Sequence, residues 1–222
     1  MKKVLALLFL VASRDATNLK VSASKTAADE IILESFQSPK HHWKQLNDPV
    51  MGGKSTGTFT VQNGAGIFDG EVVNVPFLEA PGFIKVESTG HVPYPDVSSC
   101  QALKLTIRST EQYEGYRVSF GHAHAPHGHT FAFGYKADLK ISASENFQEI
   151  KIPFNMFSDL WDDATGDQIK TCKEYPMYCP DKGTLENMKT ISIWAEGVAG
   201  KAHLEIQSIA GANCSGRDDT EE

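Results

Sequence analysis

The alternation of apolar and polar residues along many short segments constrains the fold more than any other feature of this sequence. In residues 103–108 (LKLTIR) every second side chain is apolar, so the apolar side chains share one face of an extended chain. One dry and one wet face per strand is typical of antiparallel sheets. Similar runs occupy residues 57–62, 66–73, 82–87, 116–120, 130–135, 149–152, 189–194 and 203–209.

About ten short strands, separated by Gly, Pro and Asn turns, predict an all-β fold of two packed antiparallel sheets. Only residues 181–188 (DKGTLENM) indicate a helical turn, with residues 156–160 as a second candidate. No internal repeat and no Pro- or Ser-rich break interrupts residues 31–212. We therefore expect one β-sandwich domain over that range, followed by an acidic, disordered tail at residues 213–222.

The overall charge argues against a nucleic-acid partner. The chain has 21 Lys and Arg against 28 Asp and Glu, which gives a net charge of −7. Such a balance provides no general electrostatic footprint for nucleic acid or anionic lipid.

The first residues have the build of a secretory signal, because a positively charged start precedes an unbroken apolar run at residues 4–12. That run is too short to span a bilayer, which needs roughly 20 apolar residues, and no later stretch is longer. We expect a signal peptide within residues 1–23, cleaved between residues 13 and 23, and a linker at residues 24–30. Secretion is the predicted route, and the mitochondrion is the alternative.

The four cysteines fit an oxidising compartment, since their number is even and their spacing matches no common zinc pattern. Cys172 and Cys179 are close enough to close a local loop, which would leave Cys100 to pair with Cys214. All three connectivities remain open at this point, as do free buried thiols.

The segment from Trp43 to Ser55 (WKQLNDPVMGGKS) is the most distinctive stretch. Asp48 before Pro49 favours a turn, and the two following glycines permit positive φ or a close backbone approach. One interpretation is a rigid loop that contacts a partner; the other is a structural turn in which Asp48 accepts backbone hydrogen bonds. The predicted binding residues are Trp43, Asn47, Asp48, Met51, Gly52, Gly53 and Ser55.

Two clusters of side chains could hold metal ions. A short His-rich segment, predicted to be a hairpin, is suited to zinc or copper, although an exposed hairpin without a ligand is the favoured interpretation. An acidic segment could supply oxygen ligands to calcium, but its spacing is not that of an EF-hand, and a solvated loop is the alternative. The residues are His122, His124, His127 and His129 in the first, and Asp159, Asp162, Asp163 and Asp167 in the second.

With these residues in view, the chain resembles the complex I intermediate-associated protein 30 (CIA30) family, whose domain is a galactose-binding-like jelly roll. Trp43 and residues 47–55 resemble that family's W-x3-N-D-x-V-M-G-G-x-S opening. Weaker matches, within a resemblance that runs from about Glu30 to Ala210, are residues 68–70, 81–83, 103–108 with Tyr116, 150–154 with Phe157, and 204–206 with Ile209.

The resemblance implies a non-enzymatic, chaperone-like protein-binding module that helps to assemble respiratory complex I (NADH:ubiquinone oxidoreductase). Its partner would be a membrane-complex subunit or an assembly intermediate, and no cofactor is expected. Several features depart from the family pattern: the turn after the central strand, Phe147 in place of a family Trp, the His-rich segment, the Cys172–Cys179 pair and the secretory signal.

Two other functional classes are considered. The first is a secreted carbohydrate-binding module that uses Trp161, Tyr175 and Tyr178 as stacking platforms. The second is a metal-dependent enzyme at the His-rich segment, which we rank last.

Overall fold

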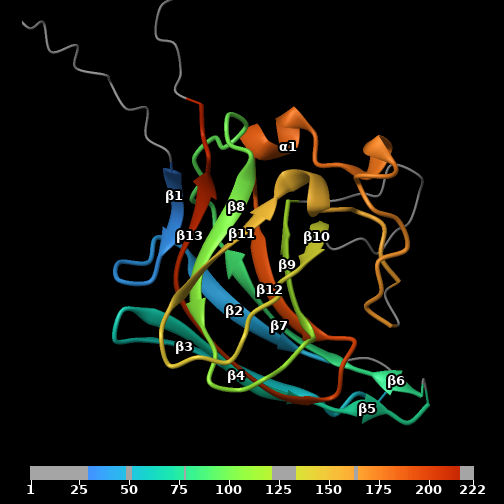
Figure 1. Cartoon of the computed structure of the whole chain (residues 1–222). Helices are drawn as coiled ribbons and strands as arrows, with labels where there is room; N and C mark the ends of the chain where they lie inside the picture. The colour runs from blue at the N-terminus through green and yellow to red at the C-terminus, as the bar shows by residue number, and fades with distance from the viewer. Residues whose placement is uncertain (1–29, 49–51, 78, 122–133, 163–164, 216–222) are drawn as a thin grey trace, which may run out of the picture.

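The computed structural model describes residues 30–48, 52–77, 79–121, 134–162 and 165–215. Nearly all of its regular structure is β (Figure 1). The strands are β1 (Glu30–Ser35), β2 (His42–Asn47), β3 (Thr56–Gln62), β4 (Ala65–Val72), β5 (Asn74–Val75), β6 (Ala80–Pro81), β7 (Phe83–Thr89), β8 (Ala102–Arg108), β9 (Tyr116–Phe120), β10 (Tyr135–Asp138), β11 (Gln148–Pro153), β12 (Ile191–Glu196) and β13 (Gly200–Ala212). The helical elements are the 3-10 turns η1 (Phe154–Met156) and η2 (Pro176–Tyr178) and the helix α1 (Lys182–Glu186).

Two antiparallel sheets form the domain. The six-stranded sheet has the order β11-β8-β13-β4-β3, with β1 added on β13. The five-stranded sheet has the order β10-β9-β12-β7-β2. A two-stranded ribbon, β5-β6, completes the described strands. This arrangement confirms the predicted all-β sandwich with antiparallel pairing.

The core lies between the two sheets and is built from the alternating apolar side chains. Leu103, Leu105 and Ile107 of β8 are fully buried and belong to the same apolar cluster as Ile191 and Ile193 of β12. Because side chains on a strand alternate between faces, one strand contributes to the core with every second residue only. The remaining faces of the two sheets carry polar and charged groups.

Several elements differ from the sequence prediction. Residues 42–47 form β2, although their pattern shows no alternation, because β2 is an edge strand and most of its side chains are exposed. A helical turn was predicted at residues 156–160, but η1 ends at Met156 and Phe157 is extended, so this prediction was wrong. The turn predicted at residues 181–188 is confirmed as α1, which Asp181 caps by accepting a hydrogen bond from Thr184 N at 2.7 Å. The strand predicted at residues 130–135 lies mostly outside the described residues, and β10 begins at Tyr135.

Two disulfides link the four cysteines, Cys100 to Cys214 and Cys172 to Cys179. The first extends the ladder between the start of β8 and the end of β13, where Ala102 pairs with Ala212. It joins positions 114 residues apart, whereas the second closes a local loop with a separation of 7. No helix in the described ranges combines the length and the apolar character that crossing a bilayer requires.

Replacing both Cys100 and Cys214 with serine should destabilise the domain by about 2–5 kcal/mol, because this bridge closes the longer loop in the unfolded chain. The same replacement at Cys172 and Cys179 should cost less. Urea unfolding of both double variants, followed by fluorescence, measures the two losses. An equal or larger loss for the Cys172–Cys179 pair would contradict the loop-length argument.

Candidate functional site

The buried carboxylate of Glu34 organises the region in which the motif begins. Glu34 is 1% exposed and accepts hydrogen bonds from the backbone N–H groups of Ser35, Lys40 and His41 at 3.0–3.2 Å. His41 Nδ1 lies 2.8 Å from its Oε2, and Trp43 Nε1 donates to the same oxygen at 3.2 Å. A buried carboxylate with this many donors is well satisfied, so it holds the chain between β1 and β2 in one conformation.

Trp43 is consequently part of the packing. Its ring lies 5.3 Å from the ring of Phe36 and 5.8 Å from that of Phe59, measured between centroids. Beside this cluster, His41 stacks on Tyr94 at 4.0 Å. Burial raises the pKa of the Tyr94 phenol far above its ordinary value, so Tyr94 stays protonated at physiological pH.

Asn47 connects the two sheets, and Asp48 extends the pairing within one of them. The side-chain oxygen of Asn47, at the end of β2, accepts a hydrogen bond from Gly57 N of β3 at 2.9 Å. Asp48 N donates to Phe83 O at 3.1 Å, which continues the β2–β7 ladder by one residue. The Asp48 carboxylate is buried between two glycines: an added Cβ would lie 2.1 Å from its Cγ at Gly53 and 2.2 Å from its Oδ2 at Gly82. Glycine is therefore required at both positions, because any larger residue would overlap the Asp48 carboxylate.

Ser55 is also buried, and its hydroxyl is occupied by the backbone. Ser55 Oγ accepts from Val73 N at 3.1 Å and donates to Val73 O at 3.4 Å. Residues 53–57 (GKSTG) match the G-x-S-x-G spacing around a hydrolase nucleophile, which calls for a strand-to-helix turn and an exposed hydroxyl. Here the serine is 3% exposed and leads into strand β3, so the structure builds no such nucleophile.

The other predicted motif residues are placed as follows. Gly52 is exposed with a φ of +75°, a conformation that glycine adopts without strain. Met51 lies outside the described residues. Asn47, Asp48, Gly53 and Ser55 lie around the β2–β3 connection, whereas Trp43 packs at the opposite end of β2, beside the β1–β2 connection. Their direct contact with a partner stays a prediction.

A second polar cluster, which the sequence did not single out, covers the outer face of the five-stranded sheet around Trp194. This side chain is 1% exposed, and its Nε1 donates to Ser119 Oγ at 2.9 Å. Lys85 Nζ lies 4.7 Å and Lys136 Nζ 4.3 Å from the Trp194 ring centroid, within the range of cation–π attraction. Lys136 is buried and pairs with buried Glu196 at 2.7 Å.

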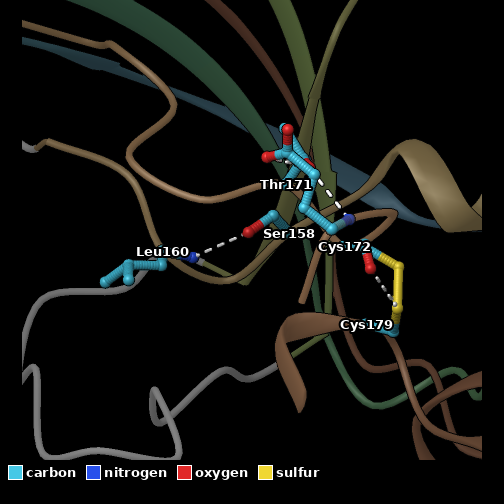
Figure 2. Close-up of a disulfide and its surroundings, with 6 residues drawn as sticks. Ser158, Leu160, Thr171, Cys172 and Cys179 are labelled. Atoms are coloured by element: carbon cyan, nitrogen blue, oxygen red, sulfur yellow. Dashed lines mark hydrogen bonds between the residues drawn. A yellow bond between two sulfur atoms is a disulfide. The ribbon is translucent and has the colours of Figure 1, made fainter. Parts of the chain in front are cut away.

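Residues 158–162 and 165–168 cover part of this face. The backbones of Ser158 and Lys136 exchange two hydrogen bonds, at 2.8 and 3.0 Å. The Trp161 ring lies 5.5 Å from Lys136 Nζ, and Gly166 packs on Glu196. Ser158 Oγ accepts from Leu160 N at 3.2 Å, and Figure 2 shows this bond beside the Cys172–Cys179 disulfide. The Lys136–Glu196 ion pair is thus buried beneath this covering chain.

The covering chain belongs to a longer stretch, residues 154–182, which we call the bridged segment because it contains the Cys172–Cys179 disulfide. It lies between β11 and α1, in the gold to orange part of the chain at the right of Figure 1. It carries four large apolar side chains that are exposed, namely Met156, Ile169, Tyr175 and Met177 at 52, 50, 42 and 58%. The other exposed large apolar residues lie on several separate elements.

The residues predicted as sugar-stacking platforms also lie in the bridged segment. Trp161 is partly buried and donates from Nε1 to Ser158 O at 3.0 Å. Tyr175 is the most exposed of the three, but Lys170 Nζ lies 4.5 Å from its ring centroid and the ring of Tyr178 6.3 Å away. The structure therefore does not present them as one open aromatic surface.

The predicted metal ligands are only partly visible. His122, His124, His127, His129 and Asp163 lie outside the described residues. Asp159 is buried, and Asp162 Oδ1 accepts from Thr165 N at 3.0 Å in a turn in which Asp162 N also donates to Asp167 O at 2.8 Å. Within the described ranges, no group of three or more His, Cys, Asp or Glu side chains is arranged to hold a metal ion. Zinc, copper and calcium binding stay predictions.

Comparison with known proteins gives a family and a fold. The family model described as complex I intermediate-associated protein 30 (CIA30) matches residues 34–175, which ends before β12 and β13. No curated protein sequence matches this chain significantly.

Among solved structures, the family 11 carbohydrate-binding module from Clostridium thermocellum, in complex with a β-1,3-1,4-mixed-linked tetrasaccharide, is similar with a TM-score of 0.53 and 16% identity. The similarity covers 85% of this chain and 98% of that one. The same family's module from the cellulosomal cellulase Lic26A-Cel5E of that organism has a TM-score of 0.49 and 16% identity, over 82% and 94% of the two chains. At such identities the first similarity shows a common jelly-roll fold and nothing about a ligand.

Replacing Gly82 with alanine should destabilise the domain by about 1–3 kcal/mol, because the new methyl group would overlap the Asp48 carboxylate. The urea midpoint measures the loss. Gly183→Ala is the matched control: its Cβ meets nothing closer than Asp181 Oδ1 at 3.7 Å, so stability should stay equal or rise. Adding Asp48→Ala to Gly82→Ala should recover part of the loss; strictly additive losses would refute the proposed overlap.

Proposed function

This chain belongs to the complex I intermediate-associated protein 30 (CIA30) family, and from that premise we propose that it is a non-enzymatic module that binds another protein during assembly of respiratory complex I. The family name supports the pathway. The β-sandwich fold by itself supports only a role as a binding scaffold, because proteins that share one fold can have many different functions.

The exposed apolar side chains of the bridged segment carry the proposal. Scattered apolar residues are normal on a protein surface, whereas a contiguous apolar patch indicates an interaction site, and we infer such a patch from the four exposed residues of this segment. Two of them, Met156 and Met177, have flexible side chains that adapt to the shape of a partner. The disulfide and the Ser158–Lys136 backbone pairing restrain the segment before binding, which lowers the entropic cost of association.

The polar face around Trp194 supports the non-enzymatic part of the proposal. Catalytic acids and bases need access to a substrate. Lys136 and Glu196 are instead paired with each other and buried. The hydroxyl of Ser55, the one serine with the G-x-S-x-G spacing of a hydrolase nucleophile, is hydrogen-bonded to backbone groups.

Glycan binding is the alternative function, and partly exposed Tyr175 is the observation that favours it. A sugar would stack on the ring face that Lys170 does not occupy. A glycan array separates the two functions: specific binding that is lost in Tyr175→Ala would support the alternative and weigh against a protein partner.

The compartment is a second discriminating observation. Two disulfides favour an oxidising environment, whereas the family role requires access to complex I. A fluorescent fusion carrying residues 1–30 should report the destination in cells. Delivery to mitochondria would support the proposed role. Delivery to the endoplasmic reticulum would remove complex I assembly and leave protein or glycan binding in the secretory pathway.

Charged substitutions in the bridged segment should abolish capture of the partner. We expect the unmodified protein to co-purify with complex I subunits from solubilised membranes of its source cells, and Ile169→Asp with Met177→Asp to reduce their yield at least about tenfold, because both place a carboxylate in an apolar contact. Quantitative mass spectrometry measures the yield.

The matched control is Ile32→Asp with Val61→Asp, which changes equally exposed apolar residues on β1 and β3. This control should retain the captured subunits. Equal losses in both double variants would show that the effect is not local to the bridged segment, and no capture by the unmodified protein would refute the proposed function.

A further inference from the structure

A groove runs along the open side of the sandwich, where the two sheets end. Two adjoining hollows of about 260 and 240 Å³ form it, and they share Met156 and Gln168 as lining residues. The larger hollow lies between β10 and β11, which are the terminal strands of the two sheets. The smaller one continues beside the bridged segment, as far as Lys173. We call the pair the edge groove.

One wall of the edge groove is an edge strand. β11 contributes four consecutive residues, Ile150 to Pro153, and pairs with β8 on one side only. Among the described residues no strand pairs with its other side. Backbone groups on such an edge are available to an added extended segment, which is a common mode of peptide recognition.

The floor of the edge groove is apolar and its rim is basic. Ile150 is partly buried, Ile152 is buried and Met156 is half-exposed, so the floor suits an apolar side chain. Lys140, Lys151 and Lys173 are exposed along the rim.

The rim lysines have no carboxylate partner within the described part of the chain. Lys151 makes only a 3.4 Å contact with Asn213 Oδ1. Asp138, which also lines the groove, pairs with Arg117 at 2.9 Å, and Glu174 accepts a hydrogen bond from Thr171 Oγ1 at 2.9 Å. The lining of the two hollows therefore has three lysines against the two carboxylates of Asp138 and Glu174, an excess of one positive charge, although the whole chain carries a net charge of −7.

We propose that the edge groove binds an extended, acidic segment of the partner protein. The main chain of that segment would lie along β11, with an apolar side chain on Ile150 and Met156 and with carboxylates near Lys140, Lys151 and Lys173. The inference rests on the proposed function, since it assumes a protein partner, and it specifies the partner's chemistry. A nucleic acid fits the groove less well, because the apolar floor makes no favourable contact with phosphate groups and the net negative charge of the chain repels them.

The charges should govern specificity and association rate more than the total affinity. Exposed ion pairs contribute little each and are screened by salt, whereas the apolar floor and the strand edge are not. Binding to the groove should therefore weaken as ionic strength rises but should not vanish.

A random dodecapeptide display library, selected on the full-length protein, tests the proposal directly. Enriched peptides should combine Asp or Glu with at least one large apolar residue. Synthetic versions should bind, by fluorescence anisotropy, at least about tenfold more weakly to the variant K140E/K151E/K173E. The matched variant K40E/K189E/K201E carries the same charge change at exposed lysines elsewhere and should bind as the unmodified protein does. Thermal unfolding of both variants verifies that they are folded.

Three outcomes would overturn the proposal: enriched peptides without an acidic bias, equal losses in the two triple variants, or binding that appears only after residues 216–222 are removed. The last result would assign the groove to the chain's own acidic tail. Capture of complex I subunits by K140E/K151E/K173E distinguishes the two hypotheses. Undiminished capture would reject the groove and keep the proposed function, whereas no capture by the unmodified protein would reject the function.

Discussion

The backbone pairing of β13 is the constraint on which the rest of the structure depends. This strand of 13 residues pairs with β4 along its first half, with β8 along its second half and with β1 at its end. It lies at the C-terminal end of the domain, while its partners come from the N-terminal end and the middle, so the six-stranded sheet forms only when distant parts of the chain meet. The same order leaves β11 at one edge, opposite β10, and so creates the groove between them.

The residues of the family motif and the exposed apolar residues of the bridged segment have different roles in the structure. Asn47 ties β2 of one sheet to β3 of the other, Asp48 extends the β2–β7 pairing, and Ser55 joins the ends of β3 and β4, so all three serve the scaffold through backbone groups. Four exposed apolar side chains lie instead on the bridged segment, which the Cys172–Cys179 disulfide closes. Family membership is therefore informative about the scaffold, and the fold alone does not assign a function to this surface.

Much of the fold could be predicted from the sequence, but less of the candidate site. Alternation located β8, β9 and β12 well because each has one face in the core. It missed β2, whose edge position leaves the strand without a buried apolar face. The distinctive motif was recognised, yet the sequence could not show whether Asp48 faces a partner or the backbone, since both interpretations use the same turn chemistry.

The sequence by itself determined the strand period, the antiparallel class and the inward side of the strands that alternate, because these depend only on which residues alternate. Only the tertiary structure decided what becomes of the outward side. Lys85, Lys136 and Trp194 stand on the outward side of their strands, where the sequence predicts contact with solvent. In the structure, residues 158–162 and 165–168 cover part of that side, and Lys136 is paired with Glu196 beneath them. Burial of a polar face depends on chain segments far away in sequence, and local periodicity carries no information about them.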